Sequence, residues 1–506
     1  MAVSEQSPTV RRDLLRLARN TAIYGFGQVL LRFVSLLLLP VFTAYLTPAE
    51  YGISSILGVF TFLVTPVVAL GISGALGVVY FESEDAQRRA ATIWTSFALV
   101  GTTSSLLAVA GIAQSGWLAS VLFPAARGAY DLPYLVVLTV LTTAMGVAAQ
   151  PLLVHLQLRE RAPAFVAITV GPAAVSILLS VIFIVFLGRG IAGFVEAGAI
   201  AQGLGLLLAL ALGLSDTPMR IDRAIGVELL RLGLPLIPAF VAIFAMQQSN
   251  KYILQIESGL AATGVYTVGY NLGMLMTIPV SGFTSAWFPF FSSFMRRHDE
   301  ARPLFGRVFT YYVLGFGTVS LLFFIGARAV VLLATQPAFH TAYVAVGPSA
   351  LAQFLIGTHS LLLAGMYFAK EVRYQIVVQG AAAVVAIILN LILIARFGVL
   401  GAAIALALGF VAMVLFQHLW NIRRRYLRIE LDGRRLARFG ILYGAVAMLF
   451  LTDRDLSLPA ELLVAGSTSA LVVGAALSML TREERARAWA ALLGRIGRVA
   501  SPEVRP

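Results

Sequence analysis

The stretch LGLPLIPAFVAIFAMQQSNKYIL, residues 232–254, decides the class of fold. As a helix it would be about 35 Å long, enough to cross the hydrocarbon core of a bilayer, which is about 30 Å thick. Its first part is apolar, whereas its second part holds two glutamines, a serine, an asparagine and a lysine. A charge is costly inside a membrane. The stretch therefore predicts a spanning helix that turns one polar face toward water or protein.

The composition extends this reading to the whole chain. Of the 506 residues, 59% are hydrophobic and only 12% are charged, and the mean hydropathy is +0.88. A soluble protein with this composition could not cover its surface with polar groups. The sequence also lacks the alternating segments of about ten residues that are typical of outer-membrane barrels. We therefore expect an all-α polytopic membrane protein. The absence of cysteine excludes disulfides and thiolate metal sites.

Hydropathy predicts about fourteen transmembrane helices, of which the thirteenth has the weakest signal. The predicted spans lie near residues 20–45, 53–80, 91–113, 132–157, 163–187, 191–214, 232–256, 262–290, 305–334, 343–368, 374–395, 398–420, 437–452 and 458–480. The first apolar run lacks a small-residue cleavage pattern. We therefore expect it to be a retained span rather than a signal peptide.

The net charge of +13 comes from arginines that are spread over the short loops between spans. If the N-terminus is cytoplasmic, most of these basic residues fall on the inner side, as the positive-inside rule requires. We therefore expect both termini in the cytoplasm, and membrane topology rather than nucleic-acid binding explains the charge. The basic tail, 481–506, has apolar residues at helical spacing. It is predicted to lie on the inner membrane surface, with a solvated tail as the alternative.

An internal duplication is visible in the sequence. Residues 45–66, YLTPAEYGISSILGVFTFLVTP, correspond to residues 257–279, ESGLAATGVYTVGYNLGMLMTIP, and the motif at 190–193 corresponds to the motif at 398–401. Both matches imply an offset of roughly 210 residues, so spans one to six and seven to twelve are predicted to be two copies of one unit. The predicted segments are a cytoplasmic N-terminal segment (1–19), an N-terminal six-helix bundle (20–214), a cytoplasmic linker (215–231), a C-terminal six-helix bundle (232–420), a basic loop with two extra helices (421–480) and a basic interfacial tail (481–506).

Four stretches in this order carry a family resemblance: LTPAEYGIS, LRLGLPLIPAF, SNKYIL followed by AATGVYTVGYNL, and IILNLILIARFGVLGAAIA. With them the chain resembles the polysaccharide-biosynthesis flippase family, which belongs to the multidrug and toxin extrusion (MATE)-like superfamily. The resemblance implies two six-helix bundles in the bacterial plasma (inner) membrane. It also implies transport of lipid-linked repeat units of O-antigen or exopolysaccharide. The family often carries an Asp-Arg-like pair where this chain has Asn250 and Lys251.

Polar residues recur at helical spacing in spans one, seven and eight. We expect these stripes to line a central, hydrated, cationic cavity, in which Arg32 and Lys251 bind a lipid diphosphate. The alternatives are that Lys251 reaches the interface and that the amides and tyrosines join helices. The predicted cavity-lining residues are Gln28, Ser35, Gln247, Gln248, Asn250, Gln255, Tyr266, Tyr270 and Asn271.

Two further ionisable residues lie within predicted spans. Glu196 could neutralise Arg32 or Lys251, or it could titrate during transport. His359 could carry a proton, although a buried histidine that only packs is the alternative. No cofactor is expected, and coupling to protons, to sodium or to the membrane potential stays open.

The leading functional prediction is a flippase that moves polyprenyl-diphosphate-linked oligosaccharides by alternating access. Its partners would be that glycan, membrane lipids and the polysaccharide polymerase machinery. A cation-coupled multidrug exporter should instead hold carboxylates in its site. A flippase for the peptidoglycan precursor differs only in cargo. A sugar polymerase needs an acid or base on a sizeable loop, and the longest outward loop, about 114–131, offers few candidates. We therefore expect a transporter rather than an enzyme.

Overall fold

The computed structural model describes residues 34 and 36–485, except 125–129, 216, 296, 427–429 and 453–455. Throughout these ranges the regular elements are helices, and ten helical stretches are long and apolar enough to cross a membrane. The predicted all-α membrane fold is therefore confirmed. The first predicted span and the basic tail lie mostly outside the described residues.

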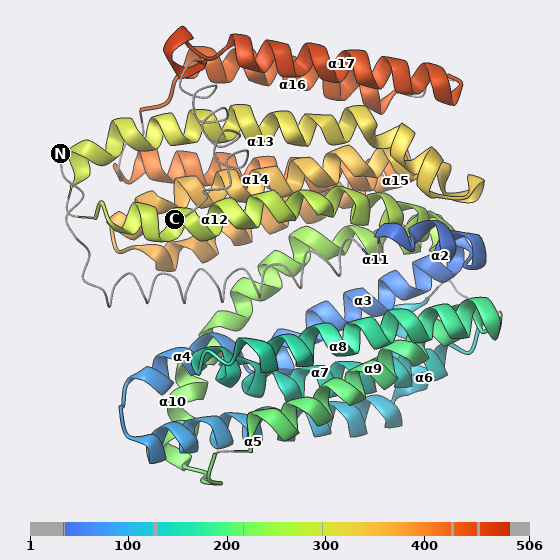
Figure 1. The fold of residues 1–506 in the computed structure, drawn as a ribbon, viewed down its shortest axis with the longest axis vertical. Coiled ribbons are helices and arrows are strands. Elements are labelled where there is room, and N and C mark those ends of the chain that lie inside the picture. The colour runs from blue at the N-terminus through green and yellow to red at the C-terminus, as the bar shows by residue number, and fades with distance from the viewer. Residues whose placement is uncertain are drawn as a thin grey trace, which may run out of the picture.

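The N-terminal half forms one bundle, which occupies the lower part of Figure 1. We call α3 to α9 the N bundle. Its helix α3 begins with a capping box, in which Thr47 and Glu50 each bond the other's backbone N–H and Pro48 occupies the first turn. The helices are α2 (Leu39–Tyr45), α3 (Pro48–Val68), α4 (Ile72–Phe81), α5 (Ala86–Ala113), α6 (Ser115–Leu122), α7 (Leu132–Leu158), α8 (Ala162–Val181) with a π-helical turn η1 (Ile182–Phe186), and α9 (Gly190–Gly213). The predicted outward loop 114–131 thus contains a short helix, α6.

A linker helix, α10 (Arg223–Gly233), packs on α4 and α5 and leads into the second bundle. We call α11 to α15 the C bundle, and α16 and α17 cover the outer side of its helix α13 (Figure 1). The elements are η2 (Leu234–Leu236), α11 (Ile237–Gly273), η3 (Met274–Met276), α12 (Thr277–Ser292), α13 (His298–Ala334), η4 (Pro337–Ala342), α14 (Tyr343–Phe368), η5 (Val372–Tyr374), α15 (Gln375–Arg423), α16 (Gly433–Leu451) and α17 (Leu458–Ser478).

Two helical stretches are long enough to cross the membrane twice. They cover residues 223–292 and 372–423 and are 70 and 52 residues long. Each is broken at a glycine whose φ is positive, Gly259 at 84° and Gly398 at 53°. A positive φ is readily adopted by glycine and rarely by other residues. The two glycines therefore mark the turns between predicted spans seven and eight and between spans eleven and twelve.

The first glycines of the matched motifs share a positive φ. Gly190 and Gly398 both have a φ of 53°. In the N bundle, the Glu50 carboxylate covers Gly190 and accepts a hydrogen bond from the Ile191 N–H at 3.1 Å. In the C bundle, the Ser258 hydroxyl lies next to Gly398. The two halves thus share a turn geometry that two copies of one unit would have.

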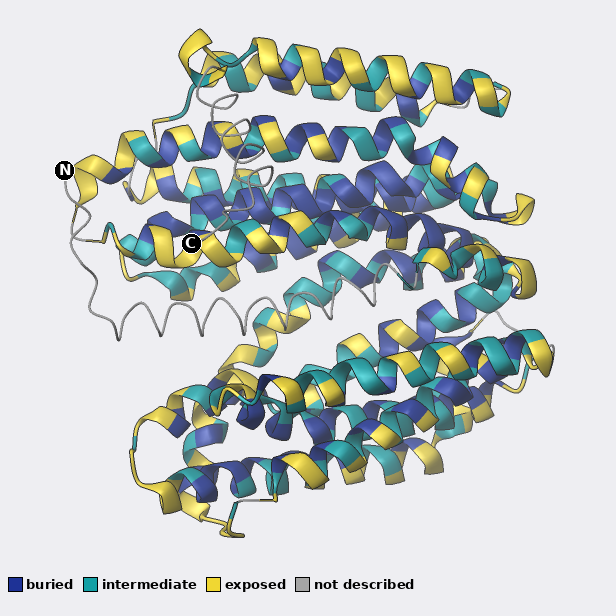
Figure 2. Cartoon of the chain, viewed as in Figure 1, coloured by how far each residue is buried: buried dark blue, intermediate teal, exposed yellow. Residues whose placement is uncertain are grey.

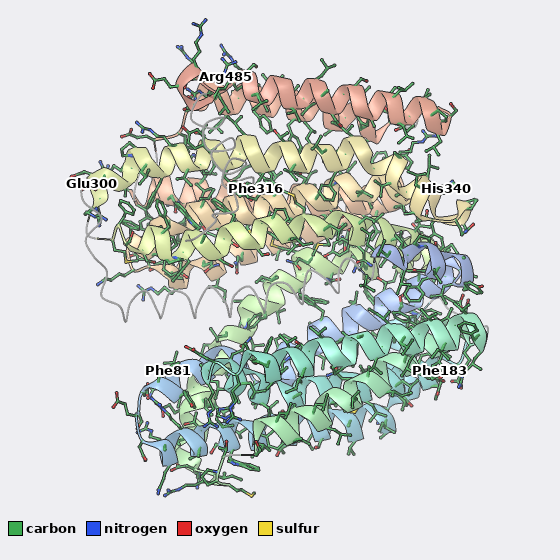
Figure 3. All side chains as sticks on the ribbon, viewed as in Figure 1. Phe81, Phe183, Glu300, Phe316, His340 and Arg485 are labelled. Carbon is green, nitrogen blue, oxygen red and sulfur yellow. The ribbon has the colours of Figure 1, made fainter. Side chains whose placement is uncertain are left out.

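Each bundle has a buried interior and an exposed outer face, as Figure 2 shows. The outer faces hold large apolar side chains, for example Val109 of the N bundle and Leu333 of the C bundle, which are 70% and 62% exposed. Lipid would cover such side chains in a membrane. The loops and helix ends on one side of the molecule carry Arg88, Arg297 and Lys370, and we call this side the basic end. Figure 3 shows Phe81 and Glu300 at the basic end, with Phe183 and His340 at the opposite end.

Candidate functional site

A buried lysine lies at the centre of the polar cluster in the C bundle. Lys251, on the first half of α11, is 7% exposed. Its Nζ atom lies 4.3 Å from the ring centroid of Tyr270, which is on the second half of the same helix. The break at Gly259 folds the two halves of α11 back on each other and brings these side chains together. A cation over an aromatic face is stabilised by the ring quadrupole, more strongly where water is excluded.

The polar residues around Lys251 bond to one another across helices. Asn250 is fully enclosed and donates a hydrogen bond to the Tyr266 hydroxyl. The Asn390 amide of α15 donates to the Ser249 hydroxyl at 3.1 Å. The first bond joins the two halves of α11, and the second joins the first half to α15. They satisfy donors that would otherwise be unpaired inside the membrane.

The spans of the C bundle offer Lys251 no carboxylate. Within residues 229–429 the acidic residues are Glu257, Asp299, Glu300 and Glu371. All four lie at helix ends or in a loop. The site is therefore cationic, with polar neutral neighbours.

Glu196 pairs with an arginine and not with Lys251, while its predicted neutralisation of Arg32, which lies outside the described residues, stays a prediction. Its carboxylate pairs with Arg189 at 2.8 Å and accepts a hydrogen bond from the Tyr134 hydroxyl at 2.8 Å. Arg189 lies directly before α9 at the end opposite the basic end, so Glu196 finds a cation two turns away on its own helix. Its predicted titration during transport stays a prediction.

The remaining predicted residues of α11 have different surroundings. Gln248 is buried and Gln247 is half-buried. Gln255 is buried, and its Nε2 atom donates to the Leu122 carbonyl at 2.8 Å. In this conformation most of the predicted cavity-lining residues thus lie between packed helices. Their place in a substrate path stays a prediction.

Three predicted residues, Gln28, Arg32 and Ser35, lie outside the described residues. His359 is buried on α14, which packs against α15, where the Gln417 amide donates to Asn421 at 2.9 Å. The structure therefore shows a polar setting for His359. Its role as a proton carrier stays a prediction.

Asn271 lines a cavity of about 530 Å³ between the two bundles. The cavity wall is mostly apolar and comes from α2, α3, α8, α9, α11 and η3. Ser54, Ser176 and Ser180 add hydroxyl groups to it. The sequence analysis missed these serines, because single hydroxyls in apolar helices form no periodic stripe.

Hydrogen bonds join the two bundles at the end opposite the basic end. The Tyr252 hydroxyl donates to the Val121 carbonyl at 2.7 Å, beside the contact of Gln255 described above. The Thr267 hydroxyl donates to the Ser55 hydroxyl at 2.7 Å. In Figure 1 the bundles approach each other where α2 and α11 meet and diverge toward α10. The described helices are therefore closed against each other at one end.

Comparisons with known proteins identify a matching family model and solved structures with a similar fold. A family model described as polysaccharide biosynthesis protein matches residues 17–295. Among curated proteins no match was found. The lipid II flippase MurJ in an inward closed conformation is similar, with a TM-score of 0.65 and 13% identity over 90% of this chain and 98% of that chain.

Two transporters of the MOP superfamily are also similar. One is a multidrug resistance MATE transporter in an inward-facing conformation, with a TM-score of 0.63 and 16% identity over 81% of this chain and 97% of that chain. The other comes from Pyrococcus furiosus, with a TM-score of 0.53 and 17% identity over 80% and 95% of the two chains. At these identities the solved structures show the fold alone, whereas the family model covers more than half of the sequence. The chain belongs to the polysaccharide biosynthesis protein family.

Proposed function

We propose that the protein is a flippase that carries polyprenyl-diphosphate-linked oligosaccharides from the cytoplasmic to the outer leaflet. Family membership supports a role in polysaccharide biosynthesis, and the fold supports transport without covalent chemistry. By the positive-inside rule the basic end faces the cytoplasm. The bundles are then closed toward the outside, and substrate enters from the cytoplasmic side.

The buried Lys251, which no carboxylate of the C-bundle spans neutralises, carries this proposal. A diphosphate brings the negative charge that this site lacks, and an ammonium group donates up to three hydrogen bonds to phosphate oxygens. A site for cationic drugs would need the opposite charge. The polarity of the C bundle therefore favours an anionic cargo over the cation-coupled exporter that shares this fold.

Lys251 is enclosed, so the diphosphate reaches it only when the helices around it move apart. Binding would then favour a conformation that differs from the one described, and substrate would shift the equilibrium between the two. The hydroxyl and amide groups of the 530 Å³ cavity suit sugar hydroxyls. The apolar remainder of its wall suits the first part of the lipid chain.

A reconstituted translocation assay tests the proposal. The full chain is placed in vesicles with a polyprenyl-diphosphate-linked oligosaccharide, and a glycosidase that cannot cross the membrane reports which sugars are outside. We expect translocation by the wild type, a strong loss with Lys251→Gln, and a loss with Arg32→Gln. Lys370→Gln is the matched control, because Lys251 and Lys370 are the chain's two lysines and Lys370 is exposed.

The same vesicles separate the alternative cargoes. Export of a cationic dye without movement of the glycolipid would overturn the proposal in favour of the multidrug exporter. Faster movement of a peptidoglycan precursor than of the oligosaccharide would favour the precursor flippase.

A further inference from the structure

The contact between α3 and the second half of α11 joins residues that the duplication makes equivalent. A Cβ atom built on Gly52 would lie 2.0 Å from the Leu260 carbonyl oxygen, and one built on Gly264 would lie 1.8 Å from the Pro48 carbonyl oxygen. Each glycine therefore meets the residue four positions before the other glycine. The equivalent pairs are Pro48 with Leu260, Gly52 with Gly264, and Ser55 with Thr267, each 212 residues apart.

Such reciprocal contacts arise where a two-fold axis passes through an interface. The third pair shows that such an axis passes through this interface, because the Thr267 hydroxyl donates to the hydroxyl of its own equivalent, Ser55, at 2.7 Å. The local axis that relates the two halves thus runs between α3 and α11, near these hydroxyls. An axis along the membrane normal is what the duplication predicts.

We infer that this crossing is the gate that closes the transport path at the end opposite the basic end. The inference rests on the proposed function. Pro48 begins α3 directly after the turn at that end, so Gly52 and Ser55 lie within its first two turns. Two further contacts between the bundles flank them: the Tyr51 and Phe339 rings with centroids 5.1 Å apart, and the Tyr252 hydroxyl on the Val121 carbonyl. A path that opens outward must separate all of these groups.

The chemistry of the crossing suits a contact that opens repeatedly. Small residues let helix backbones pack closely within a membrane, without a buried ion pair that would hold them shut. The Thr267 hydroxyl also donates to the Thr263 carbonyl of its own helix at 2.7 Å. When the gate opens, this donor keeps a partner and is not left unpaired in an apolar setting.

A double variant, Ser55→Cys with Thr267→Cys, tests the gate. The chain has no cysteine, so no native thiol competes. The two hydroxyl oxygens are 2.7 Å apart, and loss of both free thiols on oxidation reports whether the disulfide, with its S–S bond of about 2 Å, has formed. We expect an oxidant to protect both thiols from maleimide and to reduce glycolipid translocation to the background rate, and a reductant to restore it.

The matched control is Thr61→Cys with Thr143→Cys. These hydroxyls are 3.0 Å apart, and they link α3 to α7 within the N bundle. This pair should form its disulfide with little effect on translocation. Wild-type rates in the oxidised Ser55/Thr267 variant, with both thiols protected, would overturn the gate while the flippase proposal stands. An unmodified chain that moves no glycolipid would instead refute the flippase proposal.

A measurement independent of transport uses Thr267→Cys alone. Labelling by an impermeant maleimide reports how often the crossing opens to the outside. Adding Gly52→Leu should increase the labelling rate at least about tenfold, a shift of about 1.4 kcal/mol in the opening equilibrium, because the new side chain forces the helices apart. Adding Gly58→Leu should not, since a Cβ on Gly58 meets nothing within 4 Å. Equal labelling in these two variants would overturn the gate.

Discussion

The N bundle and the C bundle treat a buried charge in opposite ways. Glu196 and Lys251 are each 7% exposed. Glu196 has an arginine at 2.8 Å and a tyrosine hydroxyl at 2.8 Å, whereas Lys251 has the face of Tyr270. A buried charge with a complete set of partners stabilises the fold at its own site. A buried charge without a counter-ion costs folding free energy, and such residues in membrane spans mark functional sites.

The comparison predicts its largest effect for Lys251→Gln. Removing hydrogen bonds to a charged group costs about 1.5–3 kcal/mol, so the translocation rate should fall by about 100-fold. The thermal midpoint should not fall, because the variant removes an uncompensated buried charge. Both quantities can be measured on one detergent-purified preparation that is then reconstituted. If the variant had a lower thermal midpoint than the wild type and still translocated at the wild-type rate, Lys251 would be a structural residue rather than a substrate-binding one.

A smaller effect is expected at the ring that holds the ammonium group. Tyr270→Leu removes the aromatic face, and a desolvated cation–π contact is worth about 2 kcal/mol, so translocation should fall by about 30-fold. Tyr270→Phe keeps the face and should retain most of the rate. If Phe and Leu variants were equally slow, the hydroxyl rather than the ring would be the important group.

Glu196→Gln should show the opposite pattern. The Tyr134 hydroxyl can still donate to the amide oxygen, and Arg189 is half exposed, so the lost ion pair should reduce stability by only about 0.5–1 kcal/mol. Translocation should stay within about twofold of the wild type. Both the thermal midpoint and the translocation rate in vesicles are measured for the variant and for the wild type. A large loss of transport without a loss of stability would return Glu196 to the coupling role that the sequence suggests.

The sequence predicted the scaffold well because its signals are local. Apolar runs mark the spans, and the glycine motifs at 190 and 398 mark turns that only a residue with a positive φ can form easily. The sequence also placed Lys251 in a polar stripe, facing either a hydrated cavity or the membrane interface. Each of these features depends on residues that are close together in the chain.

The sequence could not predict how each helix is rotated about its axis relative to the next helix. The stripes that contain Asn250 and Tyr266 were both visible, and the structure turns these two side chains toward each other through the break at Gly259. A small rotation of either half would instead expose them to a cavity. Spacing along a helix defines a face, but packing decides whether that face meets water or another helix.

A second carboxylate, outside the spans, extends the comparison to the aqueous boundary. Glu484 has the same kinds of partner as Glu196: the Tyr311 hydroxyl donates to it at 2.8 Å, and Arg435 pairs with it at 3.2 Å. Burial opposes the charge, but hydrogen bonds from Thr481, Tyr311 and Arg435 lower the pKa of Glu484 to about 2. A paired carboxylate should therefore hold the segment after α17 against α13 and α16.

The pH dependence of this contact is the smallest effect that we predict. A depressed pKa stabilises the folded state above the ordinary carboxyl pKa of about 4.3, and that contribution disappears as the pH falls toward 2. Docking of residues 481–485 should thus be constant from pH 5 to 8 and weaken below about 4.3.

This docking can be measured by hydrogen exchange at the Arg485 amide, which donates to the Thr481 carbonyl at 3.0 Å. The exchange rates are corrected for their intrinsic dependence on pH. Glu484→Gln should raise the exchange rate at pH 7 and remove its dependence on acid, because the amide cannot titrate. Equal protection in the variant and the wild type would mean that apolar packing alone holds this segment, and that pairing a carboxylate with arginine and tyrosine contributes little at the aqueous boundary.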